Sequence, residues 1–277
     1  MRITMVSELL VRLFGFEREM ARIERLPRDN LNEFGFDPFG YSPDYVRSVA
    51  PYVLLFYKFY FRTQVFGVEK VPKGRVILVA NHSGQIPVDG MILATAMMVE
   101  PEEPRMVRSM VEKWVPTLPF VSYFMVRTGQ VVGTPDNCVR LLERDECISV
   151  FPEGVRGISK PFSERYKLVE FGSGFMRLAL KTRSPIVPVA IIGGEEQAPS
   201  LHNSRTLARL IGSPSFPVTP IPFPLPVRYR LFFGEPMVFR GDEDEEDERV
   251  ERKVKSVRSA LQALIHRGLR ERRHVFW

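Results

Sequence analysis

From residue 64 onward, short apolar runs alternate with amphipathic stretches, and this alternation constrains the fold more than any other feature. We expect a strand where an apolar run rich in β-branched residues is bounded by turn residues. The expected strands are 76–80, 105–111, 130–132, 147–151, 186–192 and 227–233. The helical stretches between them are 89–99, 135–144, with Thr134 as its predicted N-cap, and 175–182. Strands that alternate with helices at this spacing predict an α/β fold with a mostly parallel central sheet covered by helices.

The region before this alternation reads as an N-terminal helical hairpin, residues 1–62. Residues 6–26 carry apolar side chains on one helical stripe, which predicts one helix that is capped by Ser7 and ends before Pro27. A turn-rich stretch, 34–43, leads to a second, strongly aromatic helix that ends near Arg62. Such helices can pack on the core or lie as an anchor in a membrane interface, and the periodicity favours core packing.

The remainder, 63–277, is expected to form the α/β domain, and it contains two unusual segments. Residues 199–226 contain seven prolines among Phe, Ile and Leu, so they cannot form a sheet interior or a long helix. This apolar loop is either a lipid-facing lip or a rigid loop packed on the core. Residues 244–273 predict a charged C-terminal helix, whose acidic start and arginine-rich end complement the helix dipole.

The charge distribution points to an anionic partner. The net charge is +6, although residues 242–248 form an unbroken run of seven acidic residues, so the rest of the chain is more basic than the total suggests. Such a surface attracts nucleic acid, a phospholipid surface or a phosphorylated substrate, or it serves only to keep the protein soluble.

The composition excludes several other classes. Cys138 and Cys147 are the only cysteines, which excludes a disulfide framework and a cysteine-built zinc site, and the four histidines show no pair at metal-ligand spacing. The best candidate for a membrane span, 49–61, is interrupted by Lys58 and is far shorter than the roughly 20 apolar residues required. The N-terminus lacks the order of a signal peptide. We therefore expect a protein on the cytoplasmic side, free or lying on a membrane.

Three of the expected strands end in unusually polar sequences. The first is followed by Asn81, His82 and, further on, Asp89; the others are followed by 152–157 and 193–196. Ligands of open α/β sheets bind at the carboxyl ends of strands. If these ends converge, they supply a base, a carboxylate, an arginine and glycine backbone. This set suits acyl transfer to a hydroxyl, in which an imidazole oriented by a carboxylate takes the proton of the attacking alcohol.

The same residues carry a resemblance to a known family. Asn-His at 81–82, FPEGVRG at 151–157 and IVPVAI at 186–191 resemble the glycerolipid acyltransferase superfamily, which contains lysophosphatidate and other lysophospholipid acyltransferases. The resemblance covers about residues 64–240. It implies an acyl-CoA or acyl-carrier-protein donor as co-substrate without a further cofactor or metal, a glycerolipid acceptor, a peripheral position on a phospholipid surface at its cytoplasmic side, and no nucleic acid partner.

Carried over by position, the resemblance also assigns roles to residues. It implies that His82 is the catalytic base and Asp89 its carboxylate partner. The residues implied to bind or shape the site for the acceptor are Glu153, Gly154 and Arg156, together with Gly129 in the preceding block and Pro188 in the last one. The guanidinium of Arg156 offers a planar fork that fits a phosphate.

The sequence departs from the family pattern in ways that bear on mechanism and acceptor. Six residues separate His82 from Asp89 where four are usual, so either the loop bulges to restore the contact or another group orients His82. The block at Gly129 lacks its usual arginine, and residues 164–168 resemble the branch related to diacylglycerol acyltransferases. A lysophospholipid such as lysophosphatidate is the expected acceptor, with a neutral mono- or diacylglycerol as the alternative.

Two other classes compete with this reading. A serine hydrolase would use Ser83 beside His82, but the chain lacks a G-x-S-x-G elbow at that position, and adjacent residues rarely reach attack geometry. A non-enzymatic module that binds lipid or nucleic acid is compatible with the basic surface, but no recognition motif accompanies it. Thioester consumption separates the three: a transferase requires an acceptor alcohol, a hydrolase does not, and a binding module consumes no thioester.

Overall fold

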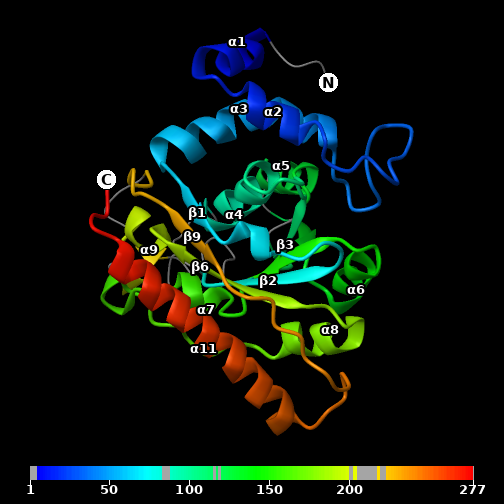
Figure 1. The fold of residues 1–277 in the computed structure, drawn as a ribbon, viewed down its shortest axis with the longest axis vertical. Helices are drawn as coiled ribbons and strands as arrows, with labels where there is room; N and C mark the ends of the chain where they lie inside the picture. The colour runs from blue at the N-terminus through cyan, green and yellow to red at the C-terminus, as the bar shows by residue number, and fades with distance from the viewer. Residues whose placement is uncertain are drawn as a thin grey trace.

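A seven-stranded sheet forms the centre of the computed structural model (Figure 1), which describes residues 5–82, 88–114, 117, 120–199, 202–204, 217–218 and 223–276. The strand order is β1-β9-β6-β2-β5-β3-β4. The strands are β1 Gln64–Phe66, β2 Val76–Ala80, β3 Val107–Val111, β4 Val131–Val132, β5 Cys147–Val150, β6 Ile186–Ile192 and β9 Arg230–Phe233. A separate antiparallel pair joins β7 His202–Asn203 to β8 Pro217–Val218.

The sheet is mixed but mostly parallel. Strands β6, β2, β5, β3 and β4 run parallel to one another, whereas β9 is antiparallel to β6 and parallel to β1. The predicted α/β class with a mostly parallel, helix-covered sheet is therefore confirmed. The short strand β1 was not predicted, and β9 begins later than expected because the N–H groups of Arg228 and Tyr229 donate to the carbonyls of Val275 and Phe61 instead of to the sheet.

Two hydrophobic cores lie on opposite faces of the sheet. In β2, Val76, Leu78 and Ala80 face one core, while Ile77 and Val79 face the other, as the two-residue period of a strand requires. The first core packs under α4 (Val88–Val99) and the N-terminal helices. The second lies under α6 (Pro135–Glu143), α8 (Gly174–Thr182) and α11 (Asp247–Glu271). Thr134 caps α6 through its hydroxyl, as predicted.

The N-terminal layer differs from its prediction. The single helix expected over 6–26 is two helices, α1 (Met5–Phe14) and α2 (Glu17–Ile23), because Gly15 between them has a φ of +66° that ends the helical path. The prediction of Ser7 as N-cap is wrong, since Ser7 lies inside α1 and is buried. The aromatic helix is confirmed as α3 (Pro43–Leu55), which continues as the π-helix η1 (Phe56–Tyr60).

These helices are not equally buried. Helices α2 and α3 pack on the first core, which agrees with the core-packing prediction. Helix α1, outermost in Figure 1, instead exposes most of its apolar side chains, namely Met5, Val6, Leu9, Leu13 and Phe14. Packing on the core thus holds for two of the three helices, and the division of the chain at residue 62 stays a prediction.

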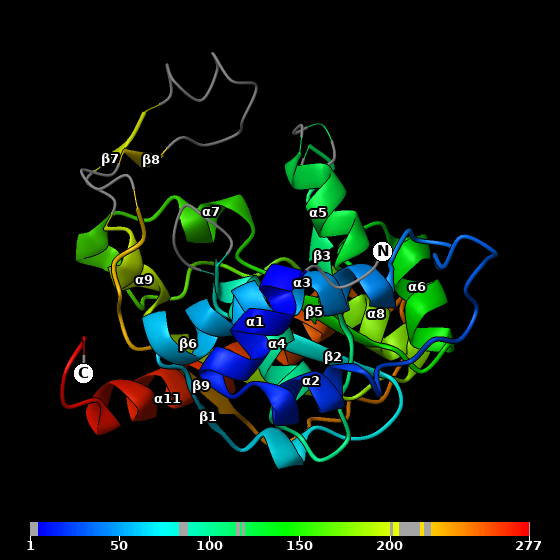
Figure 2. The same ribbon diagram turned by 90° about the horizontal axis from the view of Figure 1, so that it is seen from above.

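Shorter elements complete the chain. They are η2 Val68–Lys70, α5 Val121–Arg127, α7 Val155–Ile158, η4 Phe162–Glu164 and α9 Gly194–Gln197. Figure 2 shows α5 projecting away from the sheet. Most of the Pro-rich segment 199–226, predicted as a lip or a packed loop, falls outside the described residues. Among the helices that the structure describes, none combines the length and the apolar character that a bilayer crossing demands.

Candidate active site

The polar strand ends predicted to converge do so. Strands β2, β5 and β6 are neighbours and run parallel, so the segments that follow them emerge at one edge of the sheet. The side chain of Asn81 fixes the end of β2 to β6: its amide nitrogen donates to the carbonyl of Ile191 over 2.9 Å, and its oxygen accepts the Ile191 N–H over 2.8 Å. This clamp sets the starting point of the segment that carries His82.

His82 and Asp89 form a hydrogen-bonded pair at this edge. His82 Nδ1 lies 2.7 Å from Asp89 Oδ2, and the other carboxylate oxygen accepts the Gly90 N–H over 2.8 Å. Asp89 sits in the first turn of α4 and is fully buried. The predicted contact is confirmed despite the six-residue spacing. The bulge predicted over 83–88 stays a prediction, because residues 83–87 lie outside the described part of the chain and residue 88 already belongs to α4.

The environment of His82 leaves one ring nitrogen for chemistry. A carboxylate accepts but does not donate, so Nδ1 carries the proton of the neutral ring and Nε2 presents a lone pair. The imidazole stacks on Phe151 with ring centroids 4.5 Å apart, and the side chain keeps 18 % of its surface exposed. The pair therefore has one partner that is sealed from water and one that remains accessible.

The charges around His82 shift its pKa upward. Burial opposes the charged imidazolium, but the carboxylate of Asp89 and its hydrogen bond favour it more strongly, and Glu153 adds to them while Lys160 acts against them. The net result is a raised pKa. The ring is thus a stronger base than an ordinary histidine.

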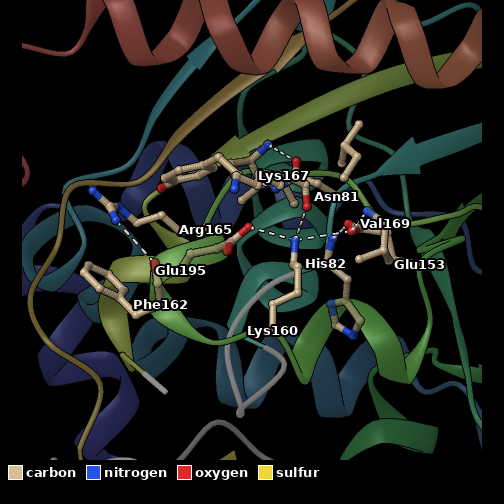
Figure 3. Close-up of polar contacts among 12 residues, drawn as sticks. Asn81, His82, Glu153, Lys160, Phe162, Arg165, Lys167, Val169 and Glu195 are labelled. Carbon is tan, nitrogen blue, oxygen red and sulfur yellow. Dashed lines mark hydrogen bonds and ion pairs between the residues drawn. The ribbon is translucent and has the colours of Figure 1, made fainter. Parts of the chain in front are cut away.

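Glu153, which the resemblance assigned to the acceptor-binding block, is buried, and its oxygens are occupied within the protein. Oε1 accepts the backbone N–H of His82 over 3.1 Å. Oε2 accepts the Val169 N–H over 3.0 Å and lies 3.2 Å from Lys160 Nζ. Figure 3 shows this carboxylate beside the backbone of His82, with the ammonium of Lys160 between it and Glu195. The structure places Glu153 as a support of the His82 segment.

Gly157 belongs to the same block, and the sequence analysis did not single it out. A Cβ at this position would come within 2.8 Å of Glu153 Cβ and 3.2 Å of His82 Cβ, so only glycine lets the two segments approach this closely. Gly154, which the resemblance did assign, has a φ of +53° and precedes α7. The two glycines together turn the chain tightly around Glu153.

Arg156 lies on the surface of this block. Its side chain is 62 % exposed and pairs with Glu170, which is 83 % exposed, over 3.3 Å. Arg156 does not pair with the nearby Glu153, whose carboxylate pairs with Lys160 instead. A surface pair of this kind is weak and readily exchanged for another anion.

The structure does not bring Gly129 and Pro188 to this cluster. Gly129, with a φ of +93°, packs beside Met106 and Arg108. Pro188 lies in the middle of β6, opposite Val79, and its ring approaches Gly234 below α11. Their predicted contributions to acceptor binding therefore gain no support from position.

The sequence analysis did not single out Lys160, and it noted Tyr166 only as part of 164–168, without a structural role. Tyr166 donates its hydroxyl proton to Glu196 and accepts the Gly193 N–H over 2.7 Å, while Arg272 pairs with Glu196 over 2.5 Å. These bonds fasten the end of β6 to α11. A lysine and a tyrosine in a polar loop carry no periodic signal, so only the polar strand end at 193–196 hinted at partners here.

The described residues include no cluster of three histidine, cysteine or carboxylate side chains that could hold a metal ion.

Cys138 and Cys147 are both buried and unpaired with each other. Burial raises the pKa of the Cys138 thiol to about 11 and that of Cys147 to about 12, so neither is a reactive thiolate at neutral pH. The chemistry available at the sheet edge is that of the histidine and its carboxylates.

Comparison with known proteins identifies relatives of this chain. The profile of the family described as Acyltransferase matches residues 62–192. An uncharacterised protein of Mycobacterium tuberculosis is 37% identical over 98% of this chain and 77% of its own length, and one of Mycobacterium leprae is 38% identical over 92% and 72%. A mouse protein named DGAT1/2-independent enzyme synthesizing storage lipids is 27% identical over 64% of this chain and 53% of its length. The crystal structure of the 1-acyl-sn-glycerophosphate acyltransferase PlsC from Thermotoga maritima matches with a TM-score of 0.47 and 21% identity, over 80% of this chain and 83% of PlsC.

Proposed function

This chain belongs to the acyltransferase family, and on that premise we propose that it moves a fatty acyl group from a thioester donor to a hydroxyl of a glycerolipid, with His82 as general base. The observation that carries the proposal is the 2.7 Å contact between His82 Nδ1 and the buried carboxylate of Asp89 at the carboxyl edge of the sheet. A base oriented in this way is the part that acyl transfer to an alcohol requires.

In the proposed reaction, His82 Nε2 accepts the hydroxyl proton of the acceptor as its oxygen attacks the thioester carbonyl. The imidazolium that forms is stabilised by Asp89, which keeps Nδ1 protonated throughout. When the tetrahedral intermediate collapses, the carbon–sulfur bond breaks and the thiolate takes the proton from Nε2. The products are an ester and a free thiol, and the histidine returns to its starting state.

The proposed donor is acyl-CoA or an acyl-carrier protein, used as co-substrate without a further cofactor. The proposed acceptor is a lysophospholipid such as lysophosphatidate. Arg156 supports this choice, because its exposed guanidinium lies three residues from Glu153 and is held at the surface by the carboxylate and the carbonyl oxygen of Glu170. A phosphate can replace that carboxylate and bind the guanidinium through two hydrogen bonds.

A neutral mono- or diacylglycerol is the second candidate acceptor. Two observations favour it: Lys160, the buried cation next to Glu153, is already engaged by carboxylates, and the mouse relative is named for the synthesis of storage lipids. A neutral acceptor would need no counterion and would leave the Arg156–Glu170 pair in place.

We also propose that the protein lies peripherally on the cytoplasmic side of a phospholipid membrane and does not bind nucleic acid. The exposed apolar side chains of α1, Met5, Val6, Leu9 and Leu13, support this position, as do Phe120, Val121 and Tyr123 at α5. Exposed apolar side chains on an amphipathic helix, combined with a net charge of +6, provide the two signals that stable peripheral binding requires.

The acceptor is tested with purified protein and one acyl-CoA, offered in parallel lysophosphatidate, other lysophospholipids, monoacylglycerol and diacylglycerol. Free thiol and the lipid product are measured together. Thiol release only with a lysophospholipid supports the first candidate, and release only with a neutral lipid replaces it by the second. Release without any acceptor indicates a hydrolase, for which Ser83, outside the described residues, is the nucleophile to test. No release with acyl-CoA or acyl-carrier protein contradicts the proposed function.

The membrane position is tested by co-sedimentation with vesicles of phosphatidylcholine, with and without an anionic lipid. We expect binding to fall at high salt and in the variant Leu9→Ser/Leu13→Ser, whose side chains are exposed on α1. The matched control, Val238→Ser, changes an exposed apolar side chain between β9 and α11 and is expected to bind normally. Equal binding by all variants and vesicle types would contradict the proposal.

A further inference from the structure

Lys160 is a buried lysine that joins three segments of the candidate site. Its Nζ lies 3.2 Å from Glu153 Oε2, 3.2 Å from Glu195 Oε1 and 3.1 Å from the carbonyl oxygen of Lys167. All three hydrogens of an ammonium group are thus matched by acceptors. Figure 3 shows the ammonium at the centre of this arrangement, between the block that follows β5 and α9, which follows β6.

The electrostatics of this cluster make the lysine indispensable to its geometry. Glu153 and Glu195 are both buried, and one cation serves the two carboxylates. Burial raises the pKa of Glu195 to about 7, with Lys160 acting against that rise. Without the ammonium, two buried carboxylates would face each other, and one would have to take up a proton or move away.

The cluster reaches the reacting residue through the backbone. Glu153 Oε1 accepts the N–H of His82 itself, so the carboxylate that Lys160 holds also fixes the main chain at the base. On its other side, the His82 ring is fixed by Asp89 through Nδ1. The imidazole is therefore positioned from two directions, by its ring and by its peptide group.

We propose that Lys160 is a positioning residue of the acyl transfer reaction: bridging Glu153 and Glu195, it holds the Glu153 carboxylate where that group fixes the backbone of His82. This inference rests on the proposed role of His82 as base. Lys160 does not touch the reacting atoms. It keeps the base in the place where Nε2 meets the acceptor hydroxyl, and a displacement of about 1 Å at such a group costs on the order of a hundredfold in rate.

The first test is the variant Lys160→Met, which keeps much of the side-chain volume and removes the charge. We expect kcat to fall about a hundredfold, with a small change in the KM for the donor. The charged groups that act on His82 are Asp89, Glu153 and Lys160, of which only Lys160 lowers its pKa. Removing it therefore raises the pKa of His82 and moves the acid limb of the pH–rate profile to higher pH. A purely structural lysine would lower the amount of folded protein and leave this limb in place.

The second test restores the charge balance without restoring the lysine. In Lys160→Met/Glu195→Gln, the Glu153 carboxylate no longer faces a second carboxylate, and the net charge of these three side chains is the same as in the wild type. We expect this double variant to be more active than Lys160→Met. The matched control is Lys253→Met. Lys253 is a partly buried lysine near the N-terminal end of α11, paired with Glu245 just before that helix, and this variant is expected to keep the wild-type kcat and pH profile.

Failure of this inference is distinguishable from failure of the proposed function. The pKa of His82, measured by NMR of the histidine ring protons and assigned with His82→Ala, does not depend on the substrate. A raised His82 pKa in Lys160→Met supports the positioning network even if the wild type transfers no acyl group. A folded Lys160→Met protein with wild-type kcat, pH profile and His82 pKa would overturn it, and so would a double variant no more active than Lys160→Met.

Discussion

Two clusters of buried charge lie on adjacent parts of the sheet, and they are built for different tasks. Around His82, the charges follow the ends of strands β2, β5 and β6. Around Arg108, they surround the interior of β3. Arg108 is 1% exposed, pairs with Asp37, and lies 3.0 Å from the carboxylate of Glu146. Its guanidinium also lies over the rings of Phe39 and Tyr41.

The two clusters differ in how far solvent or a substrate can reach their central side chain. Arg108 is closed in by carboxylates and aromatic rings, and it fastens the turn-rich stretch at 34–43 to the sheet. His82 is held as firmly by Asp89 and Glu153, yet 18 % of its side chain stays exposed. Burial of charge therefore does not identify an active site by itself. An active site also needs a reactive side chain that a substrate can reach, as His82 can be reached while its partner Asp89 is buried.

The largest expected effect separates the clusters by activity. His82→Ala should lower the rate of acyl transfer by about 10²- to 10⁴-fold, because general-base catalysis contributes that much. The protein should still fold, with a free energy of unfolding lowered by about 1–3 kcal/mol because the buried Asp89 loses its partner His82. Turnover is measured on protein whose folding has been checked by circular dichroism. Near-normal turnover in folded His82→Ala protein would remove the contrast.

For the buried cluster around Arg108, we expect a loss of stability rather than a loss of activity. Arg108→Met should lower the free energy of unfolding by about 3–5 kcal/mol, because it leaves Asp37 and Glu146 without their buried partner. Urea titration measures this loss, and kcat per folded molecule should change little. A variant with wild-type stability, or with strongly reduced kcat when fully folded, would contradict the assignment.

Asp89→Asn tests how the Asp89 carboxylate sets the pKa of His82. The rate should fall, by less than in His82→Ala, because an amide no longer stabilises the imidazolium. The acid limb of kcat/KM should move to lower pH: Asp89 raises the pKa of His82, so its neutralisation lowers that pKa and keeps the base unprotonated further into acid. A limb that stays in place or moves to higher pH would show that another group governs the titration.

The smallest effect is expected at the exposed Arg156, in contrast to the buried Arg108. Arg156→Ala should cost roughly ten- to a hundredfold in kcat/KM for a phosphate-bearing acceptor, the loss expected for a charge-assisted contact, and Arg156→Lys should recover only part of it. Stability should change by less than about 1 kcal/mol, since the pair with Glu170 is exposed. The control Glu170→Gln removes the carboxylate that pairs with Arg156 and should not reduce acceptor use. Unchanged kinetics in Arg156→Ala would favour a neutral acceptor.

The sequence predicted the parts of this structure whose signals are local. Strands β2 and β6 match their predicted bounds, because continuous apolar runs rich in Val and Ile are typical of strands buried on both faces. The His82–Asp89 contact followed from a strand end and a family motif, although the spacing is unusual. These features depend on neighbours within the same segment.

The remainder depends on partners far along the chain. Lys160 is buried because Glu195, 35 residues later, meets it across the sheet edge, and no pattern around Lys160 announces that partner. Strand β1 is three residues long, too short for a periodic signal, and exists only because β9 pairs with it. The exposed apolar side of α1 follows from the left-handed turn at Gly15, whose backbone angle a sequence does not display.

The pairing of β1 with β9 has a consequence for the order in which the protein assembles. Arg230 meets Gln64 across 166 residues of chain, and the neighbouring carbonyl of Phe61 receives the N–H of Tyr229. As the chain leaves the ribosome, the aromatic segment η1 and strand β1 emerge well before their partners, which follow about 166 residues later. Contacts this distant in sequence form late and slowly, and apolar segments that wait for them are prone to aggregate. Completion of the sheet edge is therefore a late step, in which the last strand secures the first.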